Sequence, residues 1–395
     1  MDAVQGYMYP NEVELQWSIL IVLYPYITGL VAGAFILASL ERVFKVSAVK
    51  PTYRLALLTA LAFLLVAPLP LQLHLGHPER SLEMYLTPHK ESAMAMFGFV
   101  YLWYLMVVLV LEIWLDYRKD LVLAWRSSRG VARLFYATLC LGVDNISEES
   151  LRLDDRVGHT LTIIGIPSAF LLHGYVGFIF GSIKANPWWG NVLMPIIFIM
   201  SAMVSGIAMC VLNYLVITWT RRKPIDMRCL DMMGMFLFYA LVVDAAIETL
   251  DWIHRIYSAE EDFAVIHQMA TEKLFFTLNI GQALCGTLLP LLLLGLIQIL
   301  RHRLPEIARK RMYFASALAI VIGVFAMRYN VVIGGQLFSK SLRGFMSYKL
   351  ELAGMEGWFV GLAVRVLPFI ILVFMVRLFL SERLPTSAAE HSPTA

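Results

Sequence analysis

The sequence predicts an all-α integral membrane protein, on the basis of three observations. Of its 395 residues, 59% are hydrophobic and only 15% are charged, which is more apolar surface than a water-soluble core of this length could bury. The apolar residues form continuous runs of roughly 20, the length that a helix needs to cross a hydrocarbon core ~30 Å thick. These runs do not alternate apolar with polar residues as barrel strands do, so we expect helices as the only spanning elements.

Nine segments are long and apolar enough to span the membrane, and we interpret residues 1–385 as one polytopic domain. The expected spans are residues 17–41, 55–75, 93–115, 160–183, 190–218, 229–251, 274–299, 313–335 and 357–381. A further apolar run, 131–143, has only 13 residues with charges on both sides, so it is too short to cross. We expect it to form an interfacial or partner-facing helix, although a crossing would give ten spans. The polar tail, 386–395, is expected to be disordered.

Basic residues between the spans predict the orientation. The loops after spans one, three, five and seven contain ERVFKVSAVKPTYR, a segment with seven Lys and Arg from Arg118 to Arg156, RRKPIDMR and RHRLPEIARKR, whereas the alternate loops are poor in bases. Base-rich loops remain in the cytoplasm. We therefore expect a protein of the inner (cytoplasmic) membrane with its N-terminus outside and its C-terminus in the cytoplasm. A tenth span would break this alternation for every later loop, which favours nine.

Charge and cysteine usage exclude several classes of site. The net charge is only +3 and the bases lie in short clusters between apolar runs, which argues against a nucleic-acid partner. The four cysteines are isolated and form no CxxC or CxxCH motif, so no iron–sulfur cluster, c-type haem or structural zinc is expected on this chain. A b-type haem needs paired axial ligands at membrane depth, and only His173 is deep enough, with His74 marginal.

Strongly polar residues inside the spans are the candidates for function, because such groups are costly at membrane depth. With the expected topology they gather in the external half of the protein: Tyr24, His74, His173, Tyr175, Asp244, Asn279 and Arg328. Three further residues, Glu248, Asp251 and His254, follow Asp244 toward the outer surface. The cytoplasmic half offers little beyond Asn213 and scattered threonines.

A quinone is a molecule that suits this distribution. Its ring carbonyls need hydrogen-bond donors, its reduction takes up two protons and its tail partitions into lipid. We interpret the seven residues as quinone-binding, with menaquinone or ubiquinone as the exchangeable cofactor. Asp244, Glu248, Asp251 and His254 are interpreted as a proton pathway, since offsets of four and seven place the three acids on one helical stripe. Arg328 is the expected counter-charge of Asp244.

Structural interpretations of the same residues stay open at this point. His173 could hydrogen-bond a backbone carbonyl, Asp244 and Arg328 could form a purely structural ion pair, and the last acids of the stripe could be solvated at a helix end. The two histidines of residues 73–80, LHLGHPER, lack a third ligand before Pro78 ends the helix. We expect the rim of a pocket there and no metal site.

Three stretches resemble the NrfD/PsrC family of membrane subunits. They are residues 74–98, HLGHPERSLEMYLTPHKESAMAMFG, residues 164–206, IGIPSAFLLHGYVGFIFGSIKANPWWGNVLMPIIFIMSAMVSG, and residues 328–336, RYNVVIGGQ. The last is similar to the longer branch of the family, the DsrP-type subunits of DsrMKJOP complexes in sulfur-metabolising prokaryotes. The similarity covers most of the chain. Longer members are often described with ten spans, one more than the count above.

The resemblance implies a fold and a set of partners. It implies an NrfD-like pair of four-helix bundles, here 17–183 and 190–335, with 357–381 as an additional C-terminal helix. It also implies no haem or iron–sulfur cluster on this chain and a quinone site on the external side, near a ferredoxin-like iron–sulfur subunit. A multihaem cytochrome c and other Dsr-type subunits would complete the complex.

The resemblance further implies roles for particular residues. Tyr24 stands near the position of a first-span histidine that contacts quinone in some members, and His173 and Asp244 match polar positions kept in the fourth and sixth spans. We therefore expect a membrane subunit, non-catalytic alone, that exchanges electrons between the quinone pool and an external iron–sulfur partner in sulfite or sulfide metabolism.

The alternative function is that of a secondary transporter or a proton-conducting membrane protein. Such a protein needs polar residues through both halves of the membrane and broken helices near the midplane. The sparse cytoplasmic half argues against this alternative.

Overall fold

The structure is a computed structural model that describes residues 14–258, 262–342 and 344–380. Within these ranges nine helical segments are long and apolar enough to cross a membrane, which confirms the nine spans expected from the sequence. The same ranges contain no strand beyond two isolated bridges, Glu14 with Ser347 and Phe338 with Phe345. The all-α membrane fold is therefore confirmed. The expected tail, 386–395, lies outside the described residues.

Five spans lie in the first part of the chain, and the second and third consist of two helices each. The spans are α1 (Ile19–Arg42), α2 with α3 (Lys50–Val66, Leu69–His74), α5 with α6 (Ala93–Trp103, Leu111–Ser127, joined by the π-helical η4 at Tyr104–Val110), α8 (Glu148–Gly181) and α9 (Met194–Thr220). Short helices connect them: η2 (Ser47–Val49), η3 (Pro78–Leu82), α4 (Glu83–Leu86) and α7 (Gly130–Leu139). The break after α2 coincides with Pro68, which has no amide hydrogen to continue a helix.

Four spans follow. They are α10 (Met227–Tyr257), η6 with α12 (Phe275–Leu288, Leu289–Leu300), α13 with η7 (Glu306–Tyr329, Asn330–Gly334) and α14 (Trp358–Phe379). Two short elements, α11 (Phe263–Gln268) and η5 (Met269–Lys273), precede η6. The segments η6 and η7 are π-helical, a widened helix that recurs at functional sites. Both contribute to the polar site described in the next subsection.

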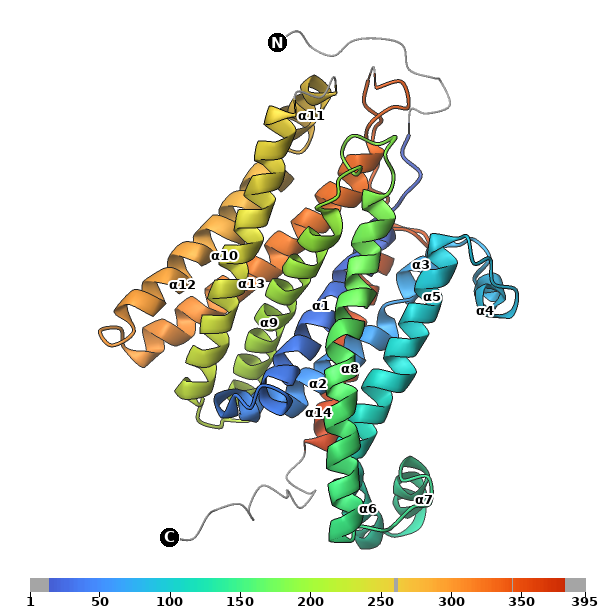
Figure 1. Cartoon of the computed structure of the whole chain (residues 1–395), viewed down its shortest axis with the longest axis vertical. Coiled ribbons are helices and arrows are strands. Elements are labelled where there is room, and N and C mark those ends of the chain that lie inside the picture. Colours follow the sequence, from blue (N-terminus) through green and yellow to red (C-terminus); the bar gives the residue numbers. More distant parts are fainter. Residues whose placement is uncertain (1–13, 259–261, 343, 381–395) are drawn as a thin grey trace.

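The short apolar run around residue 135 forms α7, a helix of ten residues, as expected from its length. It packs on α6, where Trp114 Nε1 donates a hydrogen bond of 2.9 Å to the Leu139 carbonyl. Its apolar side chains Val131 and Leu134 are exposed. At this end α6, α7 and α8 extend beyond the other helices (Figure 1). That α7 is an interfacial or partner-facing helix stays a prediction.

The pair α1 and α9 forms the centre of the molecule. The apolar window of α1 is buried throughout, and α1 contacts α2, α8 and α13 as well as α9. Gly33 of α1 faces Gly206 of α9 so closely that a Cβ at Gly33 would lie 2.8 Å from Gly206 Cα. Small residues therefore let the two backbones touch, which is how helices gain packing energy in lipid.

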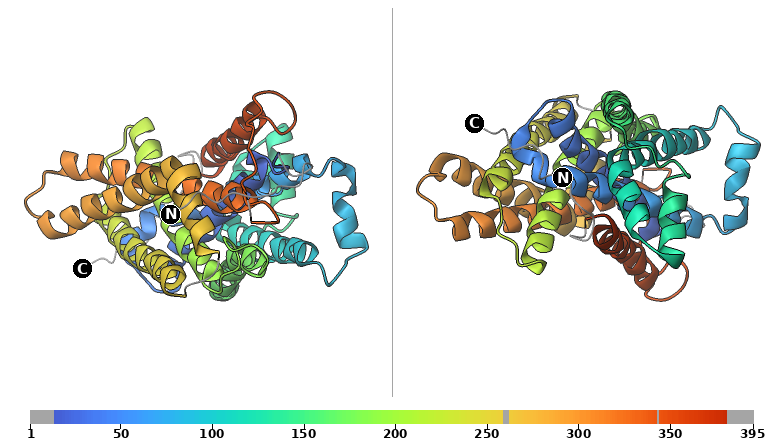
Figure 2. Two further views of the ribbon diagram at one scale, coloured as in Figure 1. Left: turned by 90° about the horizontal axis from the view of Figure 1, so that it is seen from above. Right: turned by 90° about the horizontal axis from the view of Figure 1, so that it is seen from below.

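Two groups of helices surround this centre. Figure 1 shows α10, α12 and α13 on one side of α1 and α9, and α5 and α6 on the other. The last helix, α14, packs on α2 and α1 at the periphery (Figure 2). The division into bundles at 17–183 and 190–335 remains an interpretation, because α1 packs on helices of both groups.

The helix ends form two faces. The N-terminal face, where α1 begins, carries the connections at 75–92, 182–193, 258–274 and 335–357. The opposite face carries those at 43–49, 128–147, 221–226 and 301–305, which contain the base-rich loops. The assignment of the N-terminal face to the outside of the cell remains a prediction from these charges.

Candidate functional site

A buried polar centre lies between α1, α8, α9 and α13. Arg328 of α13 donates from Nη2 to His173 Nε2 of α8 at 2.9 Å and to Ser201 Oγ of α9 at 2.6 Å. His173 Nδ1 lies 3.3 Å from Thr28 Oγ1 of α1. Arg328 and His173 are both fully buried. Four spans that are far apart in the sequence thus meet at one point.

The hydrogen bonds define the form of His173. A guanidinium can only donate, so Nε2 of His173 must accept and the ring proton must be on Nδ1. That proton is donated to Thr28, whose own hydroxyl donates to the Tyr24 carbonyl at 3.0 Å. His173 is therefore a neutral imidazole held at both nitrogens. The ring of Phe198 supports the arrangement, since the Arg328 Cζ lies 3.9 Å above its centroid.

A row of polar side chains continues from this centre along α10. Asp244 is buried, and its Oδ1 has no hydrogen-bond partner within the described chain. Glu248, one turn further, accepts from Gln282 Nε2 of η6 at 3.2 and 3.3 Å. Gln282 Oε1 in turn accepts from Asn330 Nδ2 of η7 at 2.9 Å. The π-helical segments thus place Gln282 against Glu248, and Asn330 against Gln282.

Arg328, the expected counter-charge of Asp244, lies near it without direct contact. Among the described residues no ion pair within 4.0 Å joins them, because Arg328 donates to His173 and Ser201. Both Asp244 and Glu248 are still close enough to interact electrostatically with Arg328. The sequence predicted that Asp244 and Arg328 lie at the same depth in the membrane. The direction of the Arg328 side chain depends on the rotation of α13 about its axis, which the depth does not determine.

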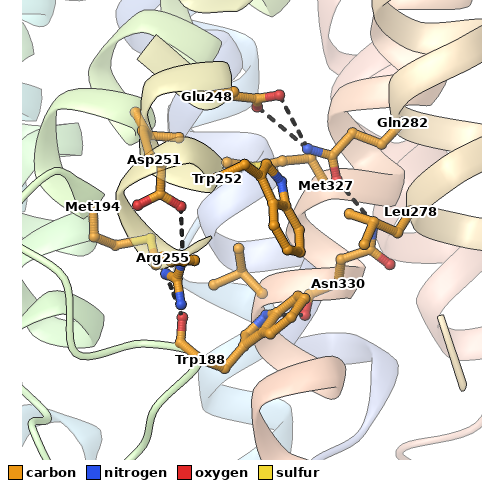
Figure 3. Close-up of a pocket in the computed structure, with 12 residues that line it drawn as sticks. Trp188, Met194, Glu248, Asp251, Trp252, Arg255, Leu278, Gln282, Met327 and Asn330 are labelled. Atoms are coloured by element: carbon orange, nitrogen blue, oxygen red, sulfur yellow. Dashed lines mark hydrogen bonds and ion pairs between the residues drawn. The ribbon is translucent and has the colours of Figure 1, made fainter. Parts of the chain in front are cut away.

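A small cavity of about 70 Å³ lies beside this row (Figure 3). Its walls include Glu248, Asp251, Trp252, Gln282 and Asn330. The cavity has polar walls and room for water, which needs only about 10–15 Å³ for each molecule's centre. It therefore offers Glu248 and Asp251 a hydrated connection.

An ion pair closes this cavity toward the N-terminal face. Arg255 Nε donates to Asp251 Oδ2 at 2.9 Å, and its other nitrogens donate to the Pro187 and Trp188 carbonyls (Figure 3). Asn191 also hydrogen-bonds Asp251. Beyond Arg255 a surface hollow of about 330 Å³ is lined by His254, Asn191 and Val192 among others. The row of acids therefore leads to the surface at this face.

A larger apolar cleft, of about 530 Å³, opens on the other side of α1. It lies between α1, α3, α4, α5 and the end of α8. Its polar lining includes Tyr24, Thr28, Gln72, His74, Arg80, Ser81, Tyr85 and Tyr101. Most of the remaining wall is aromatic or aliphatic. Volume and lining both match sites that bind small organic molecules, which typically measure roughly 300–1,000 Å³.

Two tyrosine hydroxyls of this cleft differ in whether their hydrogen is already donated. The Tyr24 hydroxyl is buried and makes no hydrogen bond within the part of the chain described. Burial raises the pKa of Tyr85, so its phenol stays protonated; it donates to the Gly98 carbonyl at 3.2 Å. At the rim, His74 Nδ1 lies 2.8 Å from Glu356 Oε2, which comes from the connection before α14.

Thr28 belongs both to the cleft and to the buried polar centre. It lines the cleft with its neighbour on the helix, Tyr24, and it contacts His173 Nδ1 on its other side. A group in the cleft is therefore one hydroxyl away from the imidazole. This is the shortest link between the two polar regions that the structure provides.

The seven residues selected from the sequence do not line one cavity. Tyr24 and His74 line the cleft, whereas His173, Asp244 and Arg328 lie behind it, toward the second group of helices. Tyr175 and Asn279 line none of the three cavities described above. The Tyr175 ring stacks on Phe97 of the cleft wall at 6.3 Å, and Asn279 donates to the Ala270 carbonyl at 3.0 Å.

Sequence analysis missed several residues of the site. Thr28 and Ser201 are small hydroxyls, which are too common in membrane helices to be a signal, although Thr28 stands four residues after Tyr24. Arg255 escaped notice because it lies at a helix end, where a cation is unremarkable without its contact to Asp251. Gln72 of the cleft carries no motif of its own, whereas Arg80 belongs to residues 73–80, where the rim of a pocket was expected.

The expectation of a nearly bare opposite half is wrong. Glu112 of α6 is fully buried; Thr162 donates to its Oε1 at 2.7 Å, and its Oε2 has no partner in the described ranges. Nearby, Arg42 bonds Tyr53 at 2.8 Å and Asp116 at 3.2 Å. Further buried charges at this end are Arg118, Asp120 and Asp231. These residues lie at or near the ends of apolar runs.

The chain matches the family model described as "Polysulphide reductase, NrfD" over residues 9–340. It belongs to this family. The match ends before α14, so the ninth span is an addition to the part that the NrfD family model covers. The family resemblance noted from the three sequence stretches is thereby confirmed, and its DsrP-type branch remains a prediction.

Two relatives of the NrfD chain belong to reductases by name. The chain is 29% identical over 324 residues to a selenate reductase subunit from Mesobacillus selenatarsenatis, covering 80% of this chain and 73% of that protein. It is 26% identical over 336 residues to a putative dimethyl sulfoxide reductase membrane subunit from Halobacterium salinarum, covering 81% and 69%. Membership in a family of reductase membrane subunits accords with the nine spans.

Proposed function

We propose that this NrfD-family chain is the quinone-interacting membrane subunit of a respiratory oxidoreductase. It exchanges electrons between the membrane quinone pool and an iron–sulfur partner that docks at the N-terminal face. The observation that supports this most directly is the apolar cleft of about 530 Å³, which contains the unpartnered Tyr24 hydroxyl and shares Thr28 with the buried polar centre.

The residues of the cleft fit a quinone. Tyr24, Gln72, His74 and Arg80 can donate hydrogen bonds to ring carbonyls, and the aliphatic and aromatic walls suit a ring with an isoprenoid tail. When bound, a menaquinone or ubiquinone would supply two-electron, two-proton chemistry. The chain itself would supply no redox centre, so electrons must come from or go to a partner protein.

Protons can be handled on both sides of Arg328. On the cleft side, the Nδ1–H of neutral His173 is donated to Thr28, and uptake of a second proton would need Nε2 to lose its hydrogen bond with Arg328. On the other side, Asp244, Glu248 and Asp251 lead along α10 to the hollow that contains His254. Asp244, Glu248, Asp251 and His254 are therefore proposed as the proton pathway.

The complex is proposed to act in sulfur metabolism. The support is the resemblance of residues 328–336 to the DsrP-type branch, together with relatives that are named as subunits of selenate and dimethyl sulfoxide reductases. Its proposed partners are a ferredoxin-like iron–sulfur subunit, a multihaem cytochrome c and other Dsr-type subunits. The proposed location is the inner membrane, with the N-terminal face outside.

Binding of a quinone analogue to the purified protein tests the proposal. In Leu71→Trp a larger side chain fills the cleft, and we expect the Kd for a hydroxyquinoline N-oxide analogue to rise at least about tenfold. Leu292→Trp is the matched control, because Leu292 is exposed on α12, away from the cleft. Equal Kd values for the wild type and Leu71→Trp would refute the cleft as the quinone site.

Proton conduction across the whole membrane is a second candidate function, and Glu112 favours it. Glu112 is fully buried in the half nearer the opposite face, and one of its carboxylate oxygens has no hydrogen-bond partner among the described residues, so it can take up a proton there. Proteoliposomes that contain a pH-sensitive dye distinguish the two functions. Proton flux without quinol, abolished by Glu112→Gln, would indicate conduction, whereas no flux above empty vesicles would leave only the quinone-linked function.

A further inference from the structure

Arg365 is a cation at membrane depth in the helix that lies beyond the family match. It stands seven residues after Trp358 and is the only charged residue of α14 before Arg377. Placing such a side chain in lipid is costly, so Arg residues inside spans usually have a partner or a function. The proposed quinone chemistry uses no residue of α14. In this part of the chain it involves only Glu356, two residues before the helix begins.

The described protein offers Arg365 aromatic rings but no anion. Its Cζ lies 3.9 Å above the Phe325 ring of α13 and 6.0 Å from the Trp358 ring. Nε is buried without a hydrogen-bond partner, and no carboxylate of the described residues forms an ion pair with the guanidinium. The neighbouring Tyr26 hydroxyl is already used, since it donates to the Val321 carbonyl at 3.2 Å. The positive charge is therefore oriented but not neutralised.

The surroundings of Arg365 are open to lipid. On α14, Leu362 and Val366 flank it and are 42% and 44% exposed, and Ile322 of α13 is 55% exposed. Between these two helices Tyr26 of α1 forms the floor, where it packs edge-on against Phe325 at 5.3 Å. The guanidinium thus lies against Phe325, next to side chains of α13 and α14 that are exposed on the surface of the protein.

The depth of Arg365 matches the phosphate layer once its side chain is considered. Seven residues correspond to about 10 Å along the helix below Trp358. Helical side chains lean toward the N-terminal end of their helix, and arginines in membranes extend toward the interface. The contact with Trp358, a residue type that favours the interface, shows that Arg365 extends in this direction.

We propose that Arg365 binds the phosphate of an anionic phospholipid at the exposed side chains of α13 and α14. Phosphate oxygens would accept from the outward-facing nitrogens of the guanidinium, while Phe325 and Trp358 hold its plane. The acyl chains would lie along the exposed side chains of the two helices. The bound lipid would supply the negative charge that the protein lacks here and would attach α14 to the family core.

Native mass spectrometry of the full-length protein tests this site. The protein is purified in detergent and incubated with equimolar palmitoyl-oleoyl phosphatidylglycerol and phosphatidylcholine. The wild type should retain the anionic lipid in preference, and Arg365→Gln should reduce that retention about fivefold, the effect expected for one arginine near a membrane surface. Arg365→Lys, which keeps the charge, should retain most of the preference.

Arg377→Gln is the matched control, because it removes the same charge from the last turn of α14. It should leave retention within about twofold of the wild type. Equal retention of both lipids by the wild type, or equal retention of phosphatidylglycerol by the wild type and Arg365→Gln, would overturn the proposal. So would displacement of the lipid by millimolar inorganic phosphate, which would indicate a site for the free anion.

Folding of the variant is checked independently. If Arg365→Gln cannot be purified, the wild type and Arg365→Lys are compared by thermal unfolding in the two lipids. A higher Tm in phosphatidylglycerol than in phosphatidylcholine for both proteins supports the site, and identical Tm values in the two lipids contradict it. Neither readout depends on quinone binding, so the proposal stands or falls separately from the function proposed above.

Discussion

Arg328 donates a hydrogen bond of 2.9 Å to the imidazole of His173, and both side chains are fully buried. The contact joins α13 to α8 at the depth where Thr28 connects the imidazole to the cleft. A cation bonded at Nε2 fixes the ring proton on Nδ1, so the imidazole faces the cleft as a hydrogen-bond donor to Thr28. The orientation of the Thr28 hydroxyl therefore depends on His173.

Replacing His173 or Asp244 by alanine should lower quinone-coupled turnover of the assembled complex. Loss of a group that transfers protons typically costs about 10²–10⁴-fold in rate, and we expect the lower end because water can enter the space. Turnover is measured with quinol and an artificial acceptor in isolated membranes, and assembly by co-purification of the iron–sulfur partner. Wild-type turnover in an assembled His173→Ala or Asp244→Ala complex would refute the assignment.

Tyr24→Phe should weaken binding of a quinone analogue by about fivefold, because it removes a donor whose hydroxyl has no partner within the described chain. The stability of the protein should not fall, since no hydrogen bond is broken. Tyr26→Phe is the control on the same helix: its hydroxyl donates to the Val321 carbonyl, outside the cleft. Binding is followed by fluorescence quenching and stability by Tm. A lower Tm with unchanged affinity in Tyr24→Phe would contradict this role.

Glu356→Gln should raise the Kd of the same analogue by no more than about fivefold. The side chains of His74 and Glu356 are 25% and 35% exposed, and partly exposed ion pairs contribute at most about 1 kcal/mol. The effect should vanish in a His74→Ala background, because Glu356 acts through the imidazole. A double-mutant cycle on Kd measures this coupling, and full additivity of the two changes would show that Glu356 does not position His74.

Gly206→Ala should destabilise the protein, since the new methyl group would overlap the backbone of Gly33 and force α1 and α9 apart. Overpacking typically costs about 1–3 kcal/mol, and backbone contacts relax less readily than side chains. Gly295→Ala is the matched control, because its Cβ would meet only the Phe238 ring, at an ordinary 3.4 Å. Tm values of the purified proteins compare the two, and equal values would refute close backbone contact at Gly206.

The spans could be predicted because lipid imposes length and polarity on each helix separately. Hydropathy alone placed all nine, and it also separated the short α7 from them. It gave the depth of polar residues correctly for His173 and Arg328, which do meet. The depth of a residue in the membrane depends only on the hydropathy of its own helix, so it can be predicted from a single sequence.

Lateral position could not be predicted in the same way. Whether Arg328 turns toward His173 or Asp244 depends on the rotation of α13 against three neighbours, and no single helix encodes that rotation. For the same reason Tyr175 and Asn279 share the depth of the site without lining its cavities. Glu112 was missed for another reason. It stands near the end of its apolar run, where the sequence pattern does not distinguish a buried acid from a solvated one.

The enclosed position of α1 has a consequence for biogenesis. During synthesis this helix enters the bilayer first, when acyl chains are its only neighbours, and its uniformly apolar surface tolerates them. Its contact surface at Gly33 is completed only when Gly206, 173 positions later in translation, has been inserted. Nascent chains that stop before the fifth hydrophobic segment should therefore leave α1 accessible to cysteine-directed crosslinking from lipid, and longer chains should protect it.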